Sequence, residues 1–221
     1  MNSFWDLAVA QLLDGGLVVY PTETFYALGC LATLDRAVER IFSVKGRSSN
    51  KPLPLIVSDW TMAHAHLRFS EAEQKLARKF WPGSLSIILA STGISALARD
   101  ADGLSAVRMC PHPLARRLCS LAGGPLVSSS ANLSGELPVS DPGVLDSLLL
   151  EKAQALVLDE RPWPAGGLPS TLVRMLDDGT LLVVREGAVS TGDLAAGGYE
   201  VRVADTCGVK DIESGLTASK G

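Results

Sequence analysis

Apolar residues recur along the chain in two spacings, which together predict alternating strands and helices. Short apolar runs bounded by Gly or Pro are typical of buried strands. Longer segments repeat an apolar residue every three or four positions, which indicates amphipathic helices. The runs predict strands at 17–20, 53–57, 84–89, 104–108, 125–127, 155–158, 170–174 and 181–184, and helices at 4–12, 33–43, 59–66, 70–79, 114–121 and 142–153.

This order of elements predicts a single α/β domain over residues 1–203, in which helices flank a twisted, mostly mixed or antiparallel sheet. The last two predicted strands lie close enough in the chain to pair antiparallel. Pro54 interrupts the run 53–57 and predicts an edge or bulged strand there. Residues 204–221 are small and polar without a period, so we expect a flexible C-terminal tail.

One segment near the N-terminus joins a strand to a group of polar side chains. The apolar run 17–20 is followed by Pro21, which lacks a ladder donor and is expected to end the strand. Thr22, Glu23 and Thr24 then follow the carboxyl end of that strand, where open α/β sheets place their ligands. The alternative is that they cap a following helix, since Thr and Glu close together resemble a capping box.

Composition and charge restrict the class of protein. The 221 residues are 47% hydrophobic and 20% charged, which is ordinary for a globular protein. No apolar run is long enough to span a membrane and no basic leader is evident, so a cytoplasmic protein without a membrane partner is expected. The net charge of −4 argues against broad RNA binding by phosphate neutralisation. The cysteines lack metal-ligand spacing and are expected to be buried free thiols: Cys30, Cys110, Cys119 and Cys207.

Positive charge is concentrated after the predicted helix 33–43 and at two strand ends. Lys45 and Arg47 are two residues apart and would point to the same side of an extended loop. Arg108 and Arg185 each end an apolar run. These cations favour an anion site, for example for a triphosphate, with a solvated basic loop as the alternative for 45–47. The sequence has no P-loop, GxGxxG, GxSxG or HExxH motif, and His112, between two prolines, is expected to shape a turn.

Seven motifs in order resemble the YrdC/TsaC family, the threonylcarbamoyl-AMP synthases, and they cover residues 4 to 190. They are Pro-Thr-Glu-Thr at 21–24, Lys-Gly-Arg at 45–47, Trp-Pro-Gly at 81–83, Ala-Val-Arg at 106–108 with His-Pro at 112–113, Ser-Ala-Asn-Leu-Ser-Gly at 130–135, Pro-Ser-Thr at 169–171 and Arg-Glu-Gly at 185–187. The resemblance implies the YrdC-like α/β fold with a concave basic cleft.

The resemblance also implies a reaction. L-threonine, bicarbonate or CO2 and ATP give threonylcarbamoyl-AMP and pyrophosphate, which is a nucleotidyltransferase activity. The product would pass to tRNA threonylcarbamoyl-transferase proteins for tRNA modification. Mg2+ would accompany the triphosphate rather than occupy a protein cage. Such chemistry needs positioning and charge neutralisation but no covalent nucleophile.

Family roles are carried over only to matching residues. Lys45 and Arg47 would be catalytic. The side chains implied to face threonine are Thr22 or Thr24, Arg108, Ser128 and Thr171, with Arg108 pairing with the substrate carboxylate. Those implied to face ATP are Lys45, Arg47, Ser130, Asn132, Ser170 and Arg185. Glu23 would hold water or a metal ion in place.

Two other functions compete with the synthase. A YciO-like paralogue would share the fold, but that branch departs at the Lys-x-Arg and Ser-x-Asn positions, whereas both motifs are present here at 45–47 and 130–132. A module that binds double-stranded RNA or tRNA belongs to a different class, and the acidic net charge disfavours it as the primary role.

Overall fold

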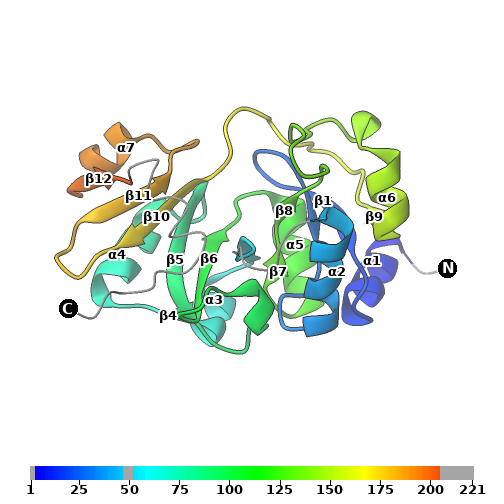
Figure 1. Ribbon diagram of the computed structural model, residues 1–221, viewed down its shortest axis with the longest axis horizontal. Helices are drawn as coiled ribbons and strands as arrows, with labels where there is room; N and C mark the ends of the chain where they lie inside the picture. Colours follow the sequence, from blue (N-terminus) through cyan, green and yellow to red (C-terminus); the bar gives the residue numbers. More distant parts are fainter. Residues whose placement is uncertain (1–2, 47–51, 205–221) are drawn as a thin grey trace.

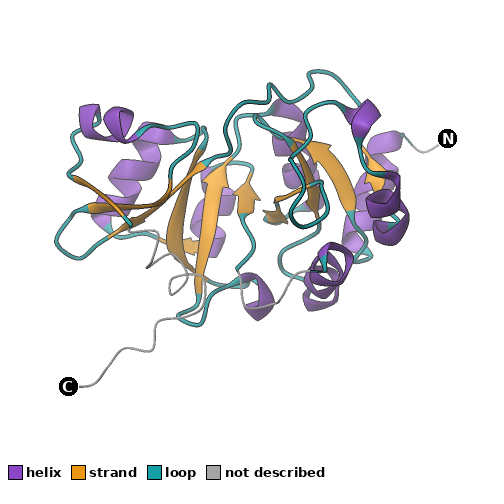
Figure 2. Ribbon diagram, turned by 45° about the horizontal axis from the view of Figure 1, so that its top comes forward, coloured by secondary structure: helices purple, strands orange, loops and turns teal. Residues whose placement is uncertain are grey.

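Strands occupy the middle of the molecule and helices pack around them (Figures 1 and 2). The computed structural model describes residues 3–46 and 52–204. In these residues the strands form two sheets, one of four strands and one of eight, rather than the one sheet that was expected. The mixed α/β class itself is confirmed.

The smaller sheet has the order β8 (Ser129–Ser130), β2 (Tyr26–Gly29), β1 (Val18–Pro21) and β9 (Leu156–Val157). β1 pairs antiparallel with β2 and parallel with β9. Val18 and Tyr20 pack in one core cluster with α1 (Phe4–Leu13) and α5 (Pro113–Ala122), whereas Leu17 and Val19 pack in another with α2 (Asp35–Lys45). Because both faces of this sheet are covered, its central strands β1 and β2 are apolar and buried throughout.

The larger sheet has the order β12 (Val201–Val203), β11 (Leu181–Arg185), β10 (Thr171–Met175), β5 (Leu85–Ser91), β6 (Leu104–Met109), β3 (Leu55–Val57) and β7 (Leu126–Val127). β4 (Leu67–Arg68) adds to β5. β10 and β11 pair antiparallel, as the short connection between them predicted. The link from β9 to β10 crosses between the two sheets along the top of Figure 1.

Most helices lie where the apolar spacing predicted them. The α-helices of the described residues are α1 (Phe4–Leu13), α2 (Asp35–Lys45), α3 (Trp60–His66), α4 (Glu71–Phe80), α5 (Pro113–Ala122), α6 (Ser147–Ala153) and α7 (Thr191–Ala196), of which α7 was not predicted. Ser3 and Ser70 begin α1 and α4 with capping boxes, closed by the carboxylates of Asp6 and Glu73. Capping satisfies amide groups that have no partner within the helix, which fixes where each of these two helices begins.

The segment after Tyr20 differs from both of its predicted forms. β1 continues through Pro21, which pairs with Tyr26 of β2. The helix-cap alternative is wrong, because residues 22–25 form a turn that leads into β2 and not into a helix. The turn is closed by Thr22, whose backbone N–H donates to the Phe25 carbonyl at 3.1 Å and whose hydroxyl donates to the same oxygen at 2.7 Å.

Three other expectations need correction. β3 is not an edge strand but lies between β6 and β7, and Pro54 precedes it. Because Pro54 lies before the strand, its missing N–H removes no bond from the ladder, and its carbonyl accepts the Ser128 N–H at 2.7 Å. The helix expected over 142–153 is split into a short 3-10 turn, Pro142–Val144, and α6, because Asp146 caps a new helix. The third is the set of predicted elements, which lacked β2, β4, β8, α7 and β12.

The remaining expectations concern the cysteines, membrane spans and the tail. Three of the cysteines, Cys30, Cys110 and Cys119, are buried free thiols as expected, and Cys207 lies outside the described residues. Within the ranges 3–46 and 52–204, no helix combines the length and the apolar character needed to cross a membrane. The boundary at residue 203 stays a prediction, since 205–221 of the expected tail lie outside the described residues.

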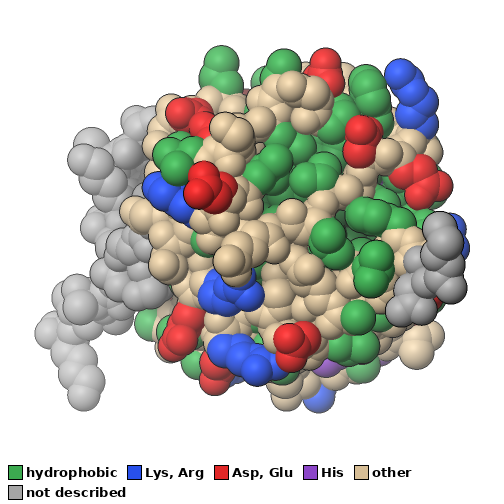
Figure 3. All heavy atoms as spheres, turned by 90° about the vertical axis from the view of Figure 1, so that its right-hand side faces the viewer, with side chains coloured by type: hydrophobic (Ala, Val, Ile, Leu, Met, Phe, Trp, Pro, Cys, Tyr) green, Lys and Arg blue, Asp and Glu red, His purple; other side chains and the backbone are tan. Residues whose placement is uncertain are grey.

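The face drawn in Figure 3, on the side of the N-terminus and α6, carries hydrophobic side chains in its middle. Exposed large hydrophobic residues of α1, α6 and the turn before α6 include Phe4, Leu7, Leu13, Val144 and Leu148. Basic and acidic side chains are interspersed around this region in Figure 3. On this face the described side chains therefore form no continuous cationic surface of the kind that a nucleic-acid backbone requires.

Candidate active site

A cavity of about 380 Å³ lies between the two sheets, a size typical of small-molecule sites. One wall is the 22–25 turn of the small sheet with residues 128–130, and the other is one face of the large sheet. The chain crosses between the sheets at Ser128, because β7 belongs to the large sheet and β8 to the small one. The cavity thus lies where distant segments of the chain meet.

Alternate residues of the large sheet form its wall of the cavity. Ser86 and Ile88 of β5, Ala106 and Arg108 of β6 and Leu172 of β10 line the cavity, as the two-residue period of a strand requires. Thr171 precedes Leu172 and therefore faces the other way. Its fully buried hydroxyl donates to the Val189 carbonyl at 2.6 Å and accepts the Val189 N–H at 3.0 Å. The structure does not bring Thr171 into the cavity, contrary to the expectation that it faces threonine.

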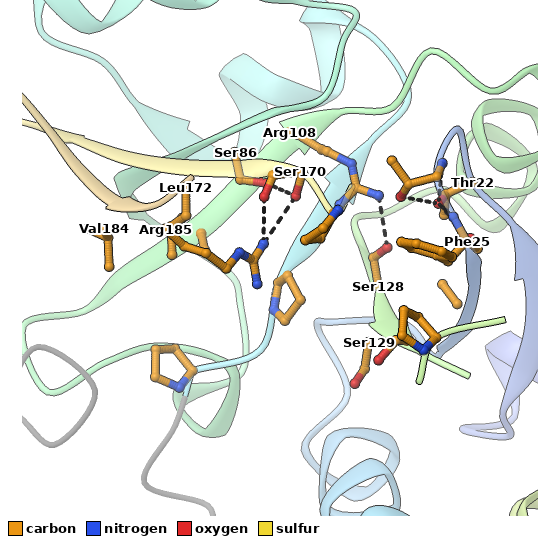
Figure 4. A pocket seen from close by; sticks show the side chains of 18 of the residues that line it. Thr22, Phe25, Ser86, Arg108, Ser128, Ser129, Ser170, Leu172, Val184 and Arg185 are labelled. Atoms are coloured by element: carbon orange, nitrogen blue, oxygen red, sulfur yellow. Dashed lines mark hydrogen bonds between the residues drawn. The ribbon is translucent and has the colours of Figure 1, made fainter. Parts of the chain in front are cut away.

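At the end of the cavity formed by the 22–25 turn, Arg108 is held by an acidic partner. Its Nε donates to Glu23 Oε1 at 2.9 Å. Its Nη2 contacts Ser128 Oγ at 3.4 Å (Figure 4). The other Glu23 oxygen, Oε2, accepts the Cys110 thiol at 2.9 Å. Arg108 and Cys110 are two residues apart, so the strand period directs both side chains at the same carboxylate.

The charges in this cluster are set by burial and by each other. Burial raises the pKa of Glu23, but the Arg108 charge and the hydrogen bonds from Cys110 and Arg108 outweigh it and leave the pKa below its usual value. Burial, followed by the Glu23 charge, raises the pKa of the Cys110 thiol to about 12. Near neutral pH Glu23 is therefore ionised, and the neutral thiol is its donor.

The two threonines of the turn have different surroundings. The Thr22 hydroxyl donates to the Phe25 carbonyl and lies 3.4 Å from the Thr24 N–H, so it holds the turn together. The Thr24 hydroxyl lies 3.5 Å from that of Thr22, and among the described residues this is its one hydrogen-bond contact. Both side chains line the cavity. Thr24 is consequently the more available of the two for a ligand.

The other end of the cavity carries a second arginine. Arg185 Nη2 donates to the Ser170 carbonyl at 2.7 Å and contacts Ser170 Oγ at 3.4 Å. Ser170 Oγ lies 3.0 Å from Ser86 Oγ, and Figure 4 shows the three side chains together. Gly187 lets the backbones pack closely here, because a Cβ at that position would collide with the Pro169 carbonyl oxygen. The sequence motifs at 169–171 and 185–187 therefore meet in space.

A buried lysine supports the loop at one side of the cavity. Lys45 Nζ, near the end of α2, donates to the Ser130 carbonyl at 2.6 Å and to Asn132 Oδ1 at 3.4 Å. In return, the Ser134 hydroxyl donates to the Lys45 carbonyl at 2.7 Å. Ser130 lines the cavity, whereas Lys45 and Asn132 are not among the lining residues and contact the loop that carries Ser130. Arg47, the partner expected for Lys45, lies outside the described residues.

Sequence reasoning missed part of the lining. Ser86 could have been found from the polar and apolar alternation at the start of its strand. The apolar floor gave no such signal, because Ile88, Ala106, Leu172 and Val184 look like ordinary core residues until the face they occupy is known. Asp100 also lines the cavity, and its Oδ1 accepts the N–H groups of Asp102 and Leu104 in a turn.

Residues 10–187 match the Sua5_yciO_yrdC family model, whose description is "Telomere recombination". Proteins of this sequence group include the threonylcarbamoyl-AMP synthase of Stenotrophomonas maltophilia (strain K279a), which is 35% identical over 168 residues, or 74% of this chain and 88% of that protein. The threonylcarbamoyl-AMP synthase of Vibrio vulnificus (strain YJ016) is 40% identical over 132 residues, or 58% of this chain and 71% of that protein.

Solved structures of similar fold include P. abyssi Sua5 complexed with L-threonine, with a TM-score of 0.81 and 27% identity. That match covers 90% of this chain but only 58% of the longer P. abyssi chain. E. coli YciO matches with a TM-score of 0.73 and 27% identity, covering 85% of this chain and 92% of that one. Sequence and fold agree, and the chain belongs to the Sua5/YciO/YrdC family.

Proposed function

We propose that this protein is an L-threonylcarbamoyladenylate synthase that converts L-threonine, bicarbonate or CO2 and ATP into threonylcarbamoyl-AMP and pyrophosphate. One observation carries the proposal. A single cavity has a buried arginine with hydroxyls at one end, a second arginine with hydroxyls at the other, and an apolar floor between them. Two anionic substrates can therefore meet end to end. The names of relatives at 35–41% identity support the same reaction.

The Arg108 end suits an amino acid. The guanidinium forms strong paired hydrogen bonds with a carboxylate, and Thr24 and Ser128 add hydroxyls beside it. The L-threonine in the P. abyssi Sua5 structure supports this choice of substrate. Thr22 acts on the ligand indirectly, by holding the turn that carries Thr24.

The Arg185 end suits the nucleotide. Ser170 and Ser130 offer hydroxyls, and Ile88, Leu172 and Val184 offer an apolar surface for a base or sugar. Lys45 and Asn132 hold the loop that carries Ser130, and Lys45 and Arg47 neutralise phosphate charge when ATP is bound. Mg2+ would be held by the phosphate oxygens and would supply further charge neutralisation there. The described residues contain no group of three or more His, Cys, Asp or Glu that could hold a metal.

The chemistry then needs alignment rather than a protein nucleophile. The threonine nitrogen forms a bond to CO2 and loses a proton, which gives a carbamate. A carbamate oxygen attacks the α-phosphorus as the bond to the bridging oxygen breaks, and pyrophosphate leaves with that oxygen. The cavity holds the reactants in one line and its fixed cations stabilise the spreading negative charge. The adenylate would then pass to proteins that transfer the threonylcarbamoyl group to tRNA.

Pyrophosphate release tests this proposal. The purified protein with ATP and Mg2+ should release pyrophosphate only when threonine and bicarbonate are both present. Release that is independent of threonine would contradict the proposal. The E. coli YciO match keeps a paralogue as the second candidate, and a folded protein that binds ATP without any threonine-dependent release would favour it. Tight, steeply salt-dependent RNA binding unaffected by threonine would favour the nucleic-acid role.

A further inference from the structure

The acidic residue of the 22–25 turn, Glu23, was expected to hold water or a metal ion, but two contacts within the protein define the surroundings of its carboxylate. Its two carboxylate oxygens each accept one hydrogen bond, Oε1 from Arg108 Nε and Oε2 from the Cys110 thiol, both at 2.9 Å. The Arg108 and Glu23 side chains are only 5% and 13% exposed. The pair is thus largely removed from water, and the lower local dielectric strengthens the attraction between its two charges.

These contacts argue against an acid, base or metal role for Glu23. A general base must reach the reacting group and have a pKa near the working pH. Glu23 is not among the residues that line the cavity, both of its oxygens face protein donors, and its pKa is held below its usual value by Arg108 and these donors despite burial. A carboxylate in this state keeps its charge and its direction. Its effect must pass through the groups that it holds.

The backbone of the same turn is held independently. The Glu23 carbonyl accepts the Ala165 N–H at 3.3 Å, and the Thr24 carbonyl accepts the Gly166 N–H at 2.8 Å. Both donors belong to the connection that crosses between the two sheets. The Glu23 carboxylate therefore belongs to a turn whose backbone is held in place. It orients the Arg108 guanidinium before any ligand binds.

We propose that Glu23, oriented by the Cys110 thiol, is the positioning residue that aims the Arg108 guanidinium at the carboxylate of the amino-acid substrate. Glu23 occupies the Nε side of the guanidinium, which leaves the Nη side toward Ser128 and the cavity. A planar guanidinium binds a carboxylate through two parallel hydrogen bonds, and it does so well only when the guanidinium plane is fixed. This inference rests on the proposed function, because it needs an amino-acid substrate at Arg108.

The rival explanation is that Glu23 competes with the substrate for Arg108. The two explanations predict opposite results for Glu23→Gln, which keeps the size and removes the charge. Positioning predicts a KM for threonine raised about tenfold, with kcat changed less than about threefold and KM for ATP unchanged. Competition predicts a lower KM for threonine. A lowered or unchanged KM in an active Glu23→Gln variant would overturn the inference.

Two variants of Cys110 test whether its thiol orients the Glu23 carboxylate, and both leave the charges of Glu23 and Arg108 unchanged. Cys110→Ser retains a donor for Glu23 Oε2, whereas Cys110→Ala removes it. We expect the alanine variant to raise KM for threonine several-fold and the serine variant to stay within about twofold of the wild type. Equal KM values for the two folded variants would overturn the orienting role, and this pair decides the question if Glu23→Gln does not fold. Wild-type protein without threonine-dependent pyrophosphate release would instead refute the proposed function.

Discussion

The side chains of Ser170 and Thr171 lie on opposite sides of the large sheet although the two residues are neighbours in the chain. The Ser170 hydroxyl lies in the cavity, 3.0 Å from that of Ser86, whereas the Thr171 hydroxyl bonds the Val189 backbone outside it. A motif that reads as two adjacent ligand hydroxyls is therefore one cavity hydroxyl followed by one structural hydroxyl.

This difference predicts separate effects of two small substitutions. Ser170→Ala should raise KM for ATP and leave the unfolding free energy nearly unchanged. Thr171→Val, which is similar in shape, should lower the unfolding free energy by about 1–3 kcal/mol because it leaves the buried Val189 backbone groups without their partner. Denaturant unfolding and steady-state kinetics on both variants measure the two effects. A Thr171→Val variant with normal stability and a raised KM would contradict this assignment.

The turn and the cavity show how far the sequence predicts this structure. Apolar spacing and caps located most helices and strands, because local preferences and burial pattern agree there. β2 was missed because Tyr26, Ala27 and Leu28 are all buried and give no alternation, so the residues before it looked equally suited to a helix cap. The partners of Glu23 were also hidden, because Arg108 and Cys110 reach it through contacts more than 80 residues apart in sequence.

Lys45 is predicted to act on the loop at 130–136 as well as on the nucleotide. Lys45→Met should remove the hydrogen bond to the Ser130 carbonyl and lower activity by more than tenfold. Amide hydrogen exchange in 130–136 should become faster, because the loop loses its buried donor. Arg174→Met, a substitution of a cation outside the cavity lining, serves as the control. Unchanged exchange in Lys45→Met would show that the loop does not depend on the lysine.

Removal of the Arg108 charge should affect both stability and binding. Arg108→Met leaves Glu23 as a buried carboxylate without its cation, so the unfolding free energy is expected to fall by about 3–5 kcal/mol. The double variant Arg108→Met with Glu23→Gln should recover part of this loss, while threonine binding stays absent in both. Chemical denaturation and a thermal shift with threonine test the two statements. A double variant less stable than either single variant would contradict a direct pair.

The same pair predicts how stability depends on pH. The folded-state pKa of Glu23 lies below its usual value of 4.5, so the carboxylate binds a proton less readily in the folded than in the unfolded protein. Its contribution to stability is therefore fully present above about pH 4.5 and is lost as the pH falls through the folded pKa. Between pH 5 and pH 3 the wild type should lose more unfolding free energy than Glu23→Gln. If the unfolding free energies of the wild type and Glu23→Gln fall in parallel as the pH is lowered, the carboxylate is not held by Arg108.

The identity of the product is the most direct test of the proposed synthase reaction. The protein would be incubated with ATP, Mg2+, threonine and carbon-13 bicarbonate, and the products analysed by mass spectrometry. The proposed synthase reaction should give an adenylate that carries one threonine and one labelled carbon, together with one pyrophosphate. This adenylate should be absent when either threonine or bicarbonate is omitted. Release of ADP and phosphate, or pyrophosphate without the labelled threonylcarbamoyl adenylate, would contradict it.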